Sequence, residues 1–150
     1  MKRQSGFTLL ELLVVVAILG ILSATAVPVY HTWQQRAYGS EALIMAKQIM
    51  DSQVTYILEH NQFFPDTNYT INHNGETTPA DALTKIYNNL HISIPVGHFL
   101  NYGFYHDTEK ETFTLTIASE GNFELFQGSN IVSYTMDKAG VVTIGYFPTQ

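Results

Sequence analysis

The hydrophobic positions of the 150-residue chain begin with one long apolar block. Residues 7–30 read FTLLELLVVVAILGILSATAVPVY, with Glu11 as the one charged residue. About 20 apolar residues in a helix cross the hydrocarbon core of a bilayer, so this block predicts a transmembrane helix. Lys2 and Arg3 precede it, and the positive-inside rule then places the N-terminus in the cytoplasm.

A cleaved secretory signal is the alternative interpretation of the same block. Such a signal has a shorter apolar stretch that ends in small residues, and the sequence from Ser23 to Ala26 is similar to such a cleavage site. The continuous length of the block and the acid within it favour a retained membrane helix instead.

Glu11 is the most informative position in the apolar block. A carboxylate inside the bilayer costs about 2.5–3.5 kcal/mol even on insertion scales, so it needs a partner or a function. One interpretation places Glu11 near the membrane interface, where its side chain reaches water. The other requires a cation at the same depth in the membrane.

Residues 31–60 contain no proline and change to an amphipathic pattern. Polar residues occupy one side of the predicted helix, and we expect the other side to pack on a core. Gly39 and Ser40 form the weakest point of the pattern, where the helix can bend. The apolar side follows three- and four-residue spacing through Leu43, Ala46, Met50, Val54 and Ile57, widened by Ala42, Met45 and Ile49.

The chain after residue 60 is built from shorter patterns. Pro65 ends the long helix, and residues 66–77 are polar, with a turn signal at Asn74-Gly75. Thr78 and Pro79 are typical of an N-cap followed by the first helical position, so a short helix is predicted over residues 79–89.

The last third of the chain predicts antiparallel strands. The clearest alternation of apolar and polar residues runs over 112–117, and turns are expected at 107–110 and 137–140. The whole pattern predicts an α+β fold, with the long N-terminal helix packed on a C-terminal antiparallel sheet of about four strands. The expected strands are 99–106, 112–117, 130–136 and 141–147, with a weaker candidate at 123–126.

Composition and charge exclude several classes of function. Charged residues make up 13% of the chain, about half of the usual share of ~25%, and the net charge is −6. An acidic chain without a Lys/Arg cluster is a poor nucleic-acid binder, because phosphate contacts need basic residues. The chain has no cysteine, which excludes a disulfide and a thiolate metal site.

No pattern indicates catalysis or a cofactor, and we predict that the chain is not an enzyme. The sequence contains no HExxH, GxSxG, phosphate-loop or GxGxxG motif. His98 and His106 could line one strand face, but packed or solvated histidines explain them better. The acids at Asp107, Glu109 and Glu111 lack the six to eight oxygens that calcium needs, so no metal site is predicted.

The start of the chain carries a specific resemblance. Gly6-Phe7-Thr8-Leu9-Leu10-Glu11 is similar to the processing site of type IV pilins and type II secretion pseudopilins. The resemblance implies a leader over residues 1–6, cleavage after Gly6 by a prepilin peptidase and N-methylation of the new terminal residue, Phe7. Glu11 would then be the fifth residue of the cut chain.

The resemblance continues to residue 30 and includes Ala17, Gly20 and Pro28. Gly20 costs about 1 kcal/mol relative to alanine in a helix, and an interior proline such as Pro28 costs about 3 kcal/mol. Two interpretations stay open, a simple kink or a segment that stretches in an assembly. Many type IV pilins close their C-terminal region with a disulfide, which this chain lacks.

The resemblance also implies an assembly chemistry. Cleavage creates a positive α-amine on Phe7, and the Glu11 carboxylate of one subunit would pair with the amine of a neighbour. Each charge alone is costly in lipid, whereas the pair offsets much of that cost and sets the axial register.

The expected organisation is a leader (1–6), a transmembrane and assembly helix (7–30) and a globular head (31–150) that includes the amphipathic helix 31–60. The resemblance implies a pilus subunit that polymerises with itself, with a prepilin peptidase and an inner-membrane assembly platform as partners. It would span the inner membrane before it joins an extracellular filament. A pseudopilin of a type II secretion system, in a periplasmic fibre, is the alternative. A single-pass membrane protein with another kind of outer domain is a more distant one.

Overall fold

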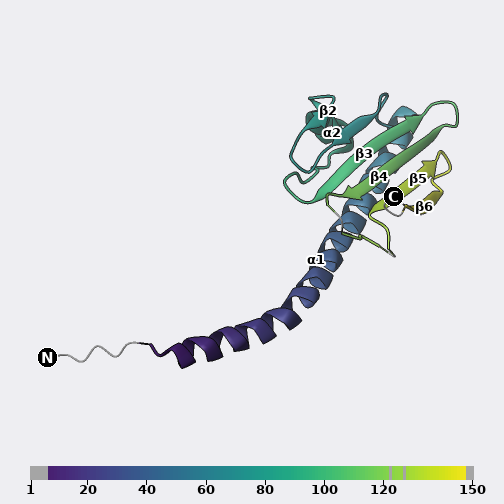
Figure 1. The fold of residues 1–150 in the computed structure, drawn as a ribbon. Coiled ribbons are helices and arrows are strands. Elements are labelled where there is room, and N and C mark those ends of the chain that lie inside the picture. The colour runs from purple at the N-terminus through teal and green to yellow at the C-terminus, as the bar shows by residue number, and fades with distance from the viewer. Residues whose placement is uncertain (1–6, 122, 127, 148–150) are drawn as a thin grey trace. The chain divides into compact units, whose positions relative to one another are not determined.

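The computed structural model describes residues 7–121, 123–126 and 128–147. Residues 1–6, the predicted leader that ends at Gly6, lie outside this part. The elements follow the order α1 (Leu9–His60), β1 (Tyr69–Ile71), β2 (Thr77–Thr78), α2 (Ala82–Leu90), β3 (Leu100–Asp107), β4 (Thr112–Ser119), β5 (Ile131–Asp137) and β6 (Val142–Phe147) (Figure 1). The α+β class, with a long N-terminal apolar helix and an antiparallel sheet, is confirmed.

The chain divides into two units, residues 1–34 and residues 35–150. In the first unit, every residue from 7 to 33 is exposed, and the apolar part of α1 is the element that its described residues form. The second unit contains the rest of α1, α2 and the sheet, and it holds the hydrophobic core.

The sheet has six strands in the order β2-β1-β3-β4-β5-β6, and all neighbouring strands are antiparallel. The four strands of the C-terminal part lie where the sequence predicts them, within a few residues. Two additional strands are present: β1, of three residues, lies within the polar stretch 66–77, and β2, of two residues, lies at its end. Strands this short have too few residues for an alternating pattern, so the sequence does not predict them.

The core lies between one face of the sheet and the second part of α1. On β4, Phe113, Leu115 and Ile117 are fully buried and alternate with half-buried residues, as the period-two pattern predicts. On α1, Ala42 and Ile49 are fully buried in the same cluster. Figure 1 shows this part of α1 behind β3 and β4.

Most of the predicted apolar face of α1 is confirmed, since Ala42, Met45, Ala46, Ile49 and Met50 are buried, but two of its members are not. Leu43 and Val54, both expected in the core, are 52% and 39% exposed. Gln53 and Tyr56 are buried in their place. Gln53 is buried because its side-chain amide forms two hydrogen bonds with the main chain of Phe64, donating to the carbonyl and accepting from the N–H at 3.1 Å.

Two local predictions after the long helix are wrong. The short helix begins at Ala82 rather than Pro79, because Thr77 and Thr78 pair with β1 and therefore belong to the sheet. Residues 123–126 do not form a strand. Only Phe126 makes an isolated bridge, with Ser129.

Gly39 is a point of close approach rather than only a weak point in the helix. A Cβ atom at this position would stand 2.8 Å from the carbonyl oxygen of Leu125. The loop after β4 therefore lies directly on α1, where Tyr38 also packs against Phe99 and Phe123 at ring distances of 5.5 and 5.1 Å.

Hydrogen bonds hold this loop in a chain that has no disulfide. The Ser119 hydroxyl donates to the carbonyl of Phe123 at 2.7 Å, and the N–H of Leu125 donates to the carbonyl of Ser129 at 2.7 Å. The Ser129 hydroxyl in turn donates to the carbonyl of Ile131 at 2.7 Å. The loop is thus tied both to the end of β4 and to the start of β5.

Candidate functional site

The first turn of α1 is closed by a reciprocal pair of hydrogen bonds. The helix begins at Leu9, so Thr8 is its N-cap. The N–H of Thr8 donates to Glu11 Oε2 at 3.0 Å, and the N–H of Glu11 donates to Thr8 Oγ1 at 3.2 Å. This is a capping box, in which Thr at the N-cap and Glu three residues later each satisfy the other's main-chain donor.

The Glu11 carboxylate has a further partner in the same turn. The Thr8 hydroxyl donates to Glu11 Oε2 at 2.9 Å. A negative charge in the first turn is also stabilised by the positive end of the helix dipole. Glu11 therefore has local partners within one chain, in addition to the membrane interface or the intermolecular cation that the sequence suggests.

Sequence reasoning missed this role of Thr8, although the chain carries a signal for it. The spacing T-x-x-E from Thr8 to Glu11 is the capping-box signature. The pairing lies at the start of an apolar helix, and it reduces the number of unsatisfied polar groups there.

The predicted modification site is described only on one side of the cut. Gly6 lies outside the described residues, so the geometry of the bond after it is not part of the structure. Phe7 is 82% exposed and stands immediately before the N-cap. Its role as the methylated N-terminus stays a prediction.

Gly20 and Pro28 both lie inside α1, which is helical from Leu9 to His60. No atom outside the helix lies within 4 Å of the position that a Cβ of Gly20 would take. Near Pro28, the Thr32 hydroxyl donates to the Pro28 carbonyl at 3.2 Å. The assembly roles of Gly20 and Pro28 stay predictions.

The apolar part of α1 leaves its side chains without cover. Among the residues that the structure describes, one helix, Leu9–His60, is long and apolar enough to cross a membrane. Leu9, Leu13 and Ile21 are each about 70% exposed or more. An exposed apolar area of this size marks a surface that contacts lipid or another protein.

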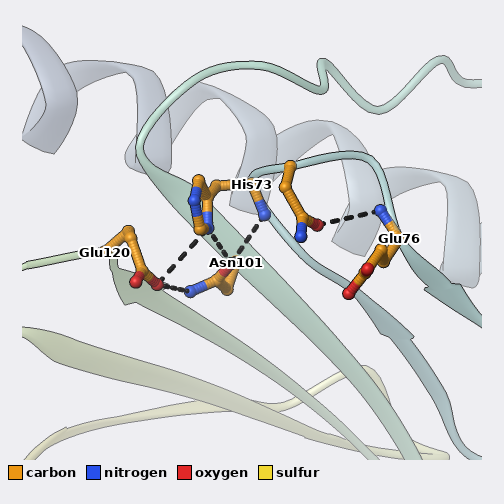
Figure 2. A network of polar contacts seen from close by, with 5 residues as sticks. His73, Glu76, Asn101 and Glu120 are labelled. Atoms are coloured by element: carbon orange, nitrogen blue, oxygen red, sulfur yellow. Dashed lines mark hydrogen bonds and ion pairs between the residues drawn. The ribbon is translucent and has the colours of Figure 1, made fainter.

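The polar network of the head connects three segments that are distant in sequence (Figure 2). The N–H of His73 donates to Asn101 Oδ1 at 2.7 Å, and Asn101 Nδ2 donates to Glu120 Oε2 at 2.9 Å. His73 Nδ1 lies 3.3 Å from the same Glu120 oxygen. The network ties the turn after β1 to the start of β3 and to the residue after β4.

His98 and His106 do not share a site. His98 Nδ1 lies 2.6 Å from Glu41 Oε1 on α1. His106 Nδ1 lies 3.1 Å from the carbonyl oxygen of Pro65, and its ring packs against Phe63. No group of three or more potential metal ligands comes together within residues 7–121, 123–126 and 128–147.

The acidic residues at the end of β3 and in the turn after it form hydrogen bonds within that turn and ion pairs with lysines. The N–H of Lys110 donates to Asp107 Oδ1 at 3.0 Å, and Lys110 Nζ lies 3.1 Å from the other Asp107 oxygen. The hydrogen bond from the Lys110 N–H, followed by the Lys110 side chain, lowers the pKa of Asp107 below its ordinary value. Glu111, just before β4, forms an ion pair with Lys138, just after the neighbouring strand β5.

Comparisons with known proteins agree with the resemblance at the start of the chain. Residues 1–27 match a family model described as the prokaryotic N-terminal methylation motif. The chain is 43% identical over 65 residues to a type IV major pilin protein, PilE1, of Neisseria gonorrhoeae, which covers 43% of this chain and 39% of that protein.

Two fimbrial proteins are also similar to this chain. The one from Moraxella nonliquefaciens is 48% identical over 86 residues, which is 57% of this chain and 50% of that protein. The one from Pseudomonas aeruginosa is 37% identical over 90 residues, which is 57% of this chain and 58% of that protein. The chain thus spans between 39% and 58% of the length of these three relatives. No solved structure matched the chain. The resemblance to pilins is confirmed.

Proposed function

We propose that this chain is the structural subunit of a type IV pilus. A prepilin peptidase would cut it after Gly6, and residues 7–30 would assemble it into an extracellular filament. The observation that carries the proposal is the combination of an N-terminal methylation motif with an apolar helix whose side chains are exposed throughout. Such a helix needs lipid before assembly and other subunits after it.

The capping box supports a two-stage role for Glu11. Before assembly, Thr8 supplies the carboxylate with two hydrogen bonds, so the single chain can hold the charge near the membrane. After cleavage, the α-amine of Phe7 offers a stronger partner, because a charged donor makes a shorter and stronger hydrogen bond than a neutral one. Pairing with the amine of a neighbouring copy would then fix the axial register of the filament.

The proposed partners follow from this mechanism. They are other copies of the chain, a prepilin peptidase and an assembly platform in the inner membrane. N-methylation would keep the amine of Phe7 basic and add apolar surface. The chain would cross the inner membrane once, with its N-terminus in the cytoplasm, until it joins the filament.

A pseudopilin of a type II secretion system is the second candidate. The absence of cysteine favours it, because many type IV pilins close their C-terminal region with a disulfide. The hydrogen bonds of Ser119 and Ser129 offer another way to hold the loop before β5. The names of the similar proteins favour the pilus.

The proposal is tested by the filament yield of three variants. Glu11→Ala should reach the membrane at the normal level but reduce filaments in the sheared fraction by about tenfold or more, since an unpaired amine is costly in the apolar assembly. Thr8→Ala removes the cap but keeps the carboxylate, so its loss of yield should be smaller. Glu59→Ala is the control, because Glu59 is exposed on the same helix.

Three outcomes would contradict the proposal. Normal filament yield from Glu11→Ala would show that assembly does not need the pairing of Glu11 with the Phe7 amine. Equal losses from Thr8→Ala and Glu11→Ala would show that the carboxylate acts only as a helix cap. Absence of any filament from the unchanged chain, in cells with a functional prepilin peptidase, would contradict the pilus itself.

A further inference from the structure

The apolar face of the sheet continues beyond the part that α1 covers. Leu115, Tyr134 and Ile144 lie directly opposite one another on β4, β5 and β6, so their side chains point to the same face. Leu115 is fully buried and Tyr134 is 6% exposed, but Ile144 is 47% exposed. The last strand therefore presents core-type side chains that the described residues cover only in part, as at Tyr146, whose ring lies 6.5 Å from that of Phe126.

The neighbouring side of α1 is apolar as well. Val54 and Leu58 are 39% and 82% exposed. With Ile57 they line one side of a hollow of about 160 Å³, and Lys138, Ala139 and Gly140 of the turn between β5 and β6 line the other side. The hollow places these α1 residues next to the start of β6.

We call the set Val54, Leu58, Val142, Ile144 and Tyr146 the α1–β6 surface. The three β6 residues alternate along the strand and share the core-facing side of the sheet, opposite Met136, Tyr134 and Val132. All five side chains are exposed by about two fifths or more.

The composition of β6 makes this exposure unusual. An edge strand of a sheet is normally protected by charged residues or proline, because an uncovered apolar edge aggregates. Residues 141–147 read VVTIGYF and contain neither. A covered state of this edge explains the composition better than permanent contact with water.

We propose that the α1–β6 surface binds the apolar helical segment Leu12–Val29 of a second copy of this chain. The inference rests on the proposed filament function and specifies its contact. The segment carries no charge and is exposed along its whole length, as its partner surface requires. Lys138, the cation that lines the hollow, is paired with Glu111, so the surface presents little free charge.

The two surfaces also match in kind. A helix with its side chains is about 10–12 Å wide, and it packs on another helix by placing rows of its side chains into the grooves between the partner's side chains. In the membrane, lipid can cover the apolar segment. The α1–β6 surface belongs to the folded head, whose charged residues make lipid an unsuitable cover for it. A segment from a second copy would cover both apolar surfaces at once.

Disulfide cross-linking in assembled filaments tests this contact. The chain has no cysteine, so every disulfide comes from the introduced residues, and mass spectrometry of the linked peptides separates the dimer of position 144 with the helix from dimers of two identical chains. Chains with Ile144→Cys would be co-expressed with chains that carry one cysteine at each position from 12 to 29, and sheared filaments would be oxidised with copper phenanthroline. Cross-linked dimers should appear with a three- to four-residue period along the segment.

Thr143→Cys is the matched control. Thr143 lies on the same strand but on the opposite face, where it pairs with Thr135. We expect at least about tenfold less dimer from Thr143→Cys than from Ile144→Cys at the best helix position, because its side chain points away from the contact. Filaments without any Ile144→Cys product, or with equal product from Thr143→Cys, would overturn this contact and leave the pilus function standing. Failure of the cysteine-free parent to form filaments would overturn both.

Charge substitution gives an independent measurement. Ile144→Asp should lower the filament yield by about tenfold or more, while Thr143→Asp should leave it within about twofold of the parent, since a charge buried in an apolar contact is costly. Thermal unfolding of the detergent-solubilised chain verifies that both variants fold. Equal filament yields from the two folded variants would contradict the contact.

Discussion

The two parts of helix α1 differ in what covers their apolar side chains. Leu19, in the first part, is 55% exposed, whereas Ile49, in the second part, is fully buried. Both are helical, and both belong to apolar patterns that the sequence shows clearly. The difference teaches that an apolar helix is stabilised either by its own chain or by its surroundings, and that each case has its own experimental signature.

The second part of α1 packs in the core of the head, whereas the first part exposes its side chains to lipid or to other subunits. Substitutions in the second part should change the free energy of unfolding of the head. Substitutions in the first part should leave that free energy unchanged and affect the membrane or the filament instead.

The largest effect is expected from emptying the core at Ile49. Ile49→Ala should lower the free energy of unfolding by about 2–5 kcal/mol, because it removes buried apolar area and leaves a cavity. Ile18→Ala, in the exposed part, should change it by less than about 0.5 kcal/mol. Urea unfolding of the detergent-solubilised chain, followed by circular dichroism, measures both. Similar losses from the two variants would contradict the division of the helix.

The next largest loss in unfolding free energy is expected at Gln53, because it is a buried polar residue on the packed face of α1. Gln53→Leu leaves the N–H and the carbonyl of Phe64 without their partner, at a net cost of about 1–3 kcal/mol, because the buried apolar surface of the leucine offsets part of the penalty. Gln48→Leu, at an exposed position of the same helix, is the control. A Gln53→Leu chain as stable as the control would show that the amide contributes nothing to the fold.

The two glycines of α1 make a matched comparison. Gly39→Ala places a methyl group against the Leu125 carbonyl, and we expect a net loss of about 1 kcal/mol or more after the gain in helix propensity. Gly20→Ala meets no atom outside the helix and should not destabilise the head. Thermal unfolding of the two chains measures the difference. A stabilised Gly39→Ala chain would contradict the close contact of the loop with α1.

The smallest effect is a pH dependence in the turn after β3. The pKa of Asp107 is lowered in the folded chain, so its contribution is present above the ordinary value of about 3.9 and disappears as the pH falls through the folded pKa. Asp107→Asn should therefore be less stable than the parent at neutral pH and approach it in acid. A constant difference in unfolding free energy across this range would exclude the carboxylate as its source.

The sequence predicts the elements that depend on local pattern. The apolar block at 7–30 and the alternation of β4 are long and regular, so each indicates its element without reference to the rest of the chain. The fold class follows from these two patterns, and the candidate site at Gly6-Phe7 follows from its resemblance to a processing motif.

The features that the sequence does not predict depend on tertiary contacts. The burial of Gly39 and Gln53 on α1 comes from the loop that lies on Gly39 and from the bonds between Gln53 and Phe64, and neither contact appears in the spacing of apolar residues. The β1 and β2 strands are stabilised by pairing with β3 and with each other. The capping role of Thr8 has a sequence signature. It is overlooked because the free-energy cost of a carboxylate in the membrane draws attention to Glu11 alone.

The mass of the subunit in sheared filaments tests the central claim most directly. The proposal predicts a chain that begins at Phe7, without residues 1–6, and carries one additional methyl group on its α-amine. Tandem mass spectrometry of the N-terminal peptide would place that group. A chain that still begins at Met1, or one that begins after Ala26, would contradict the account.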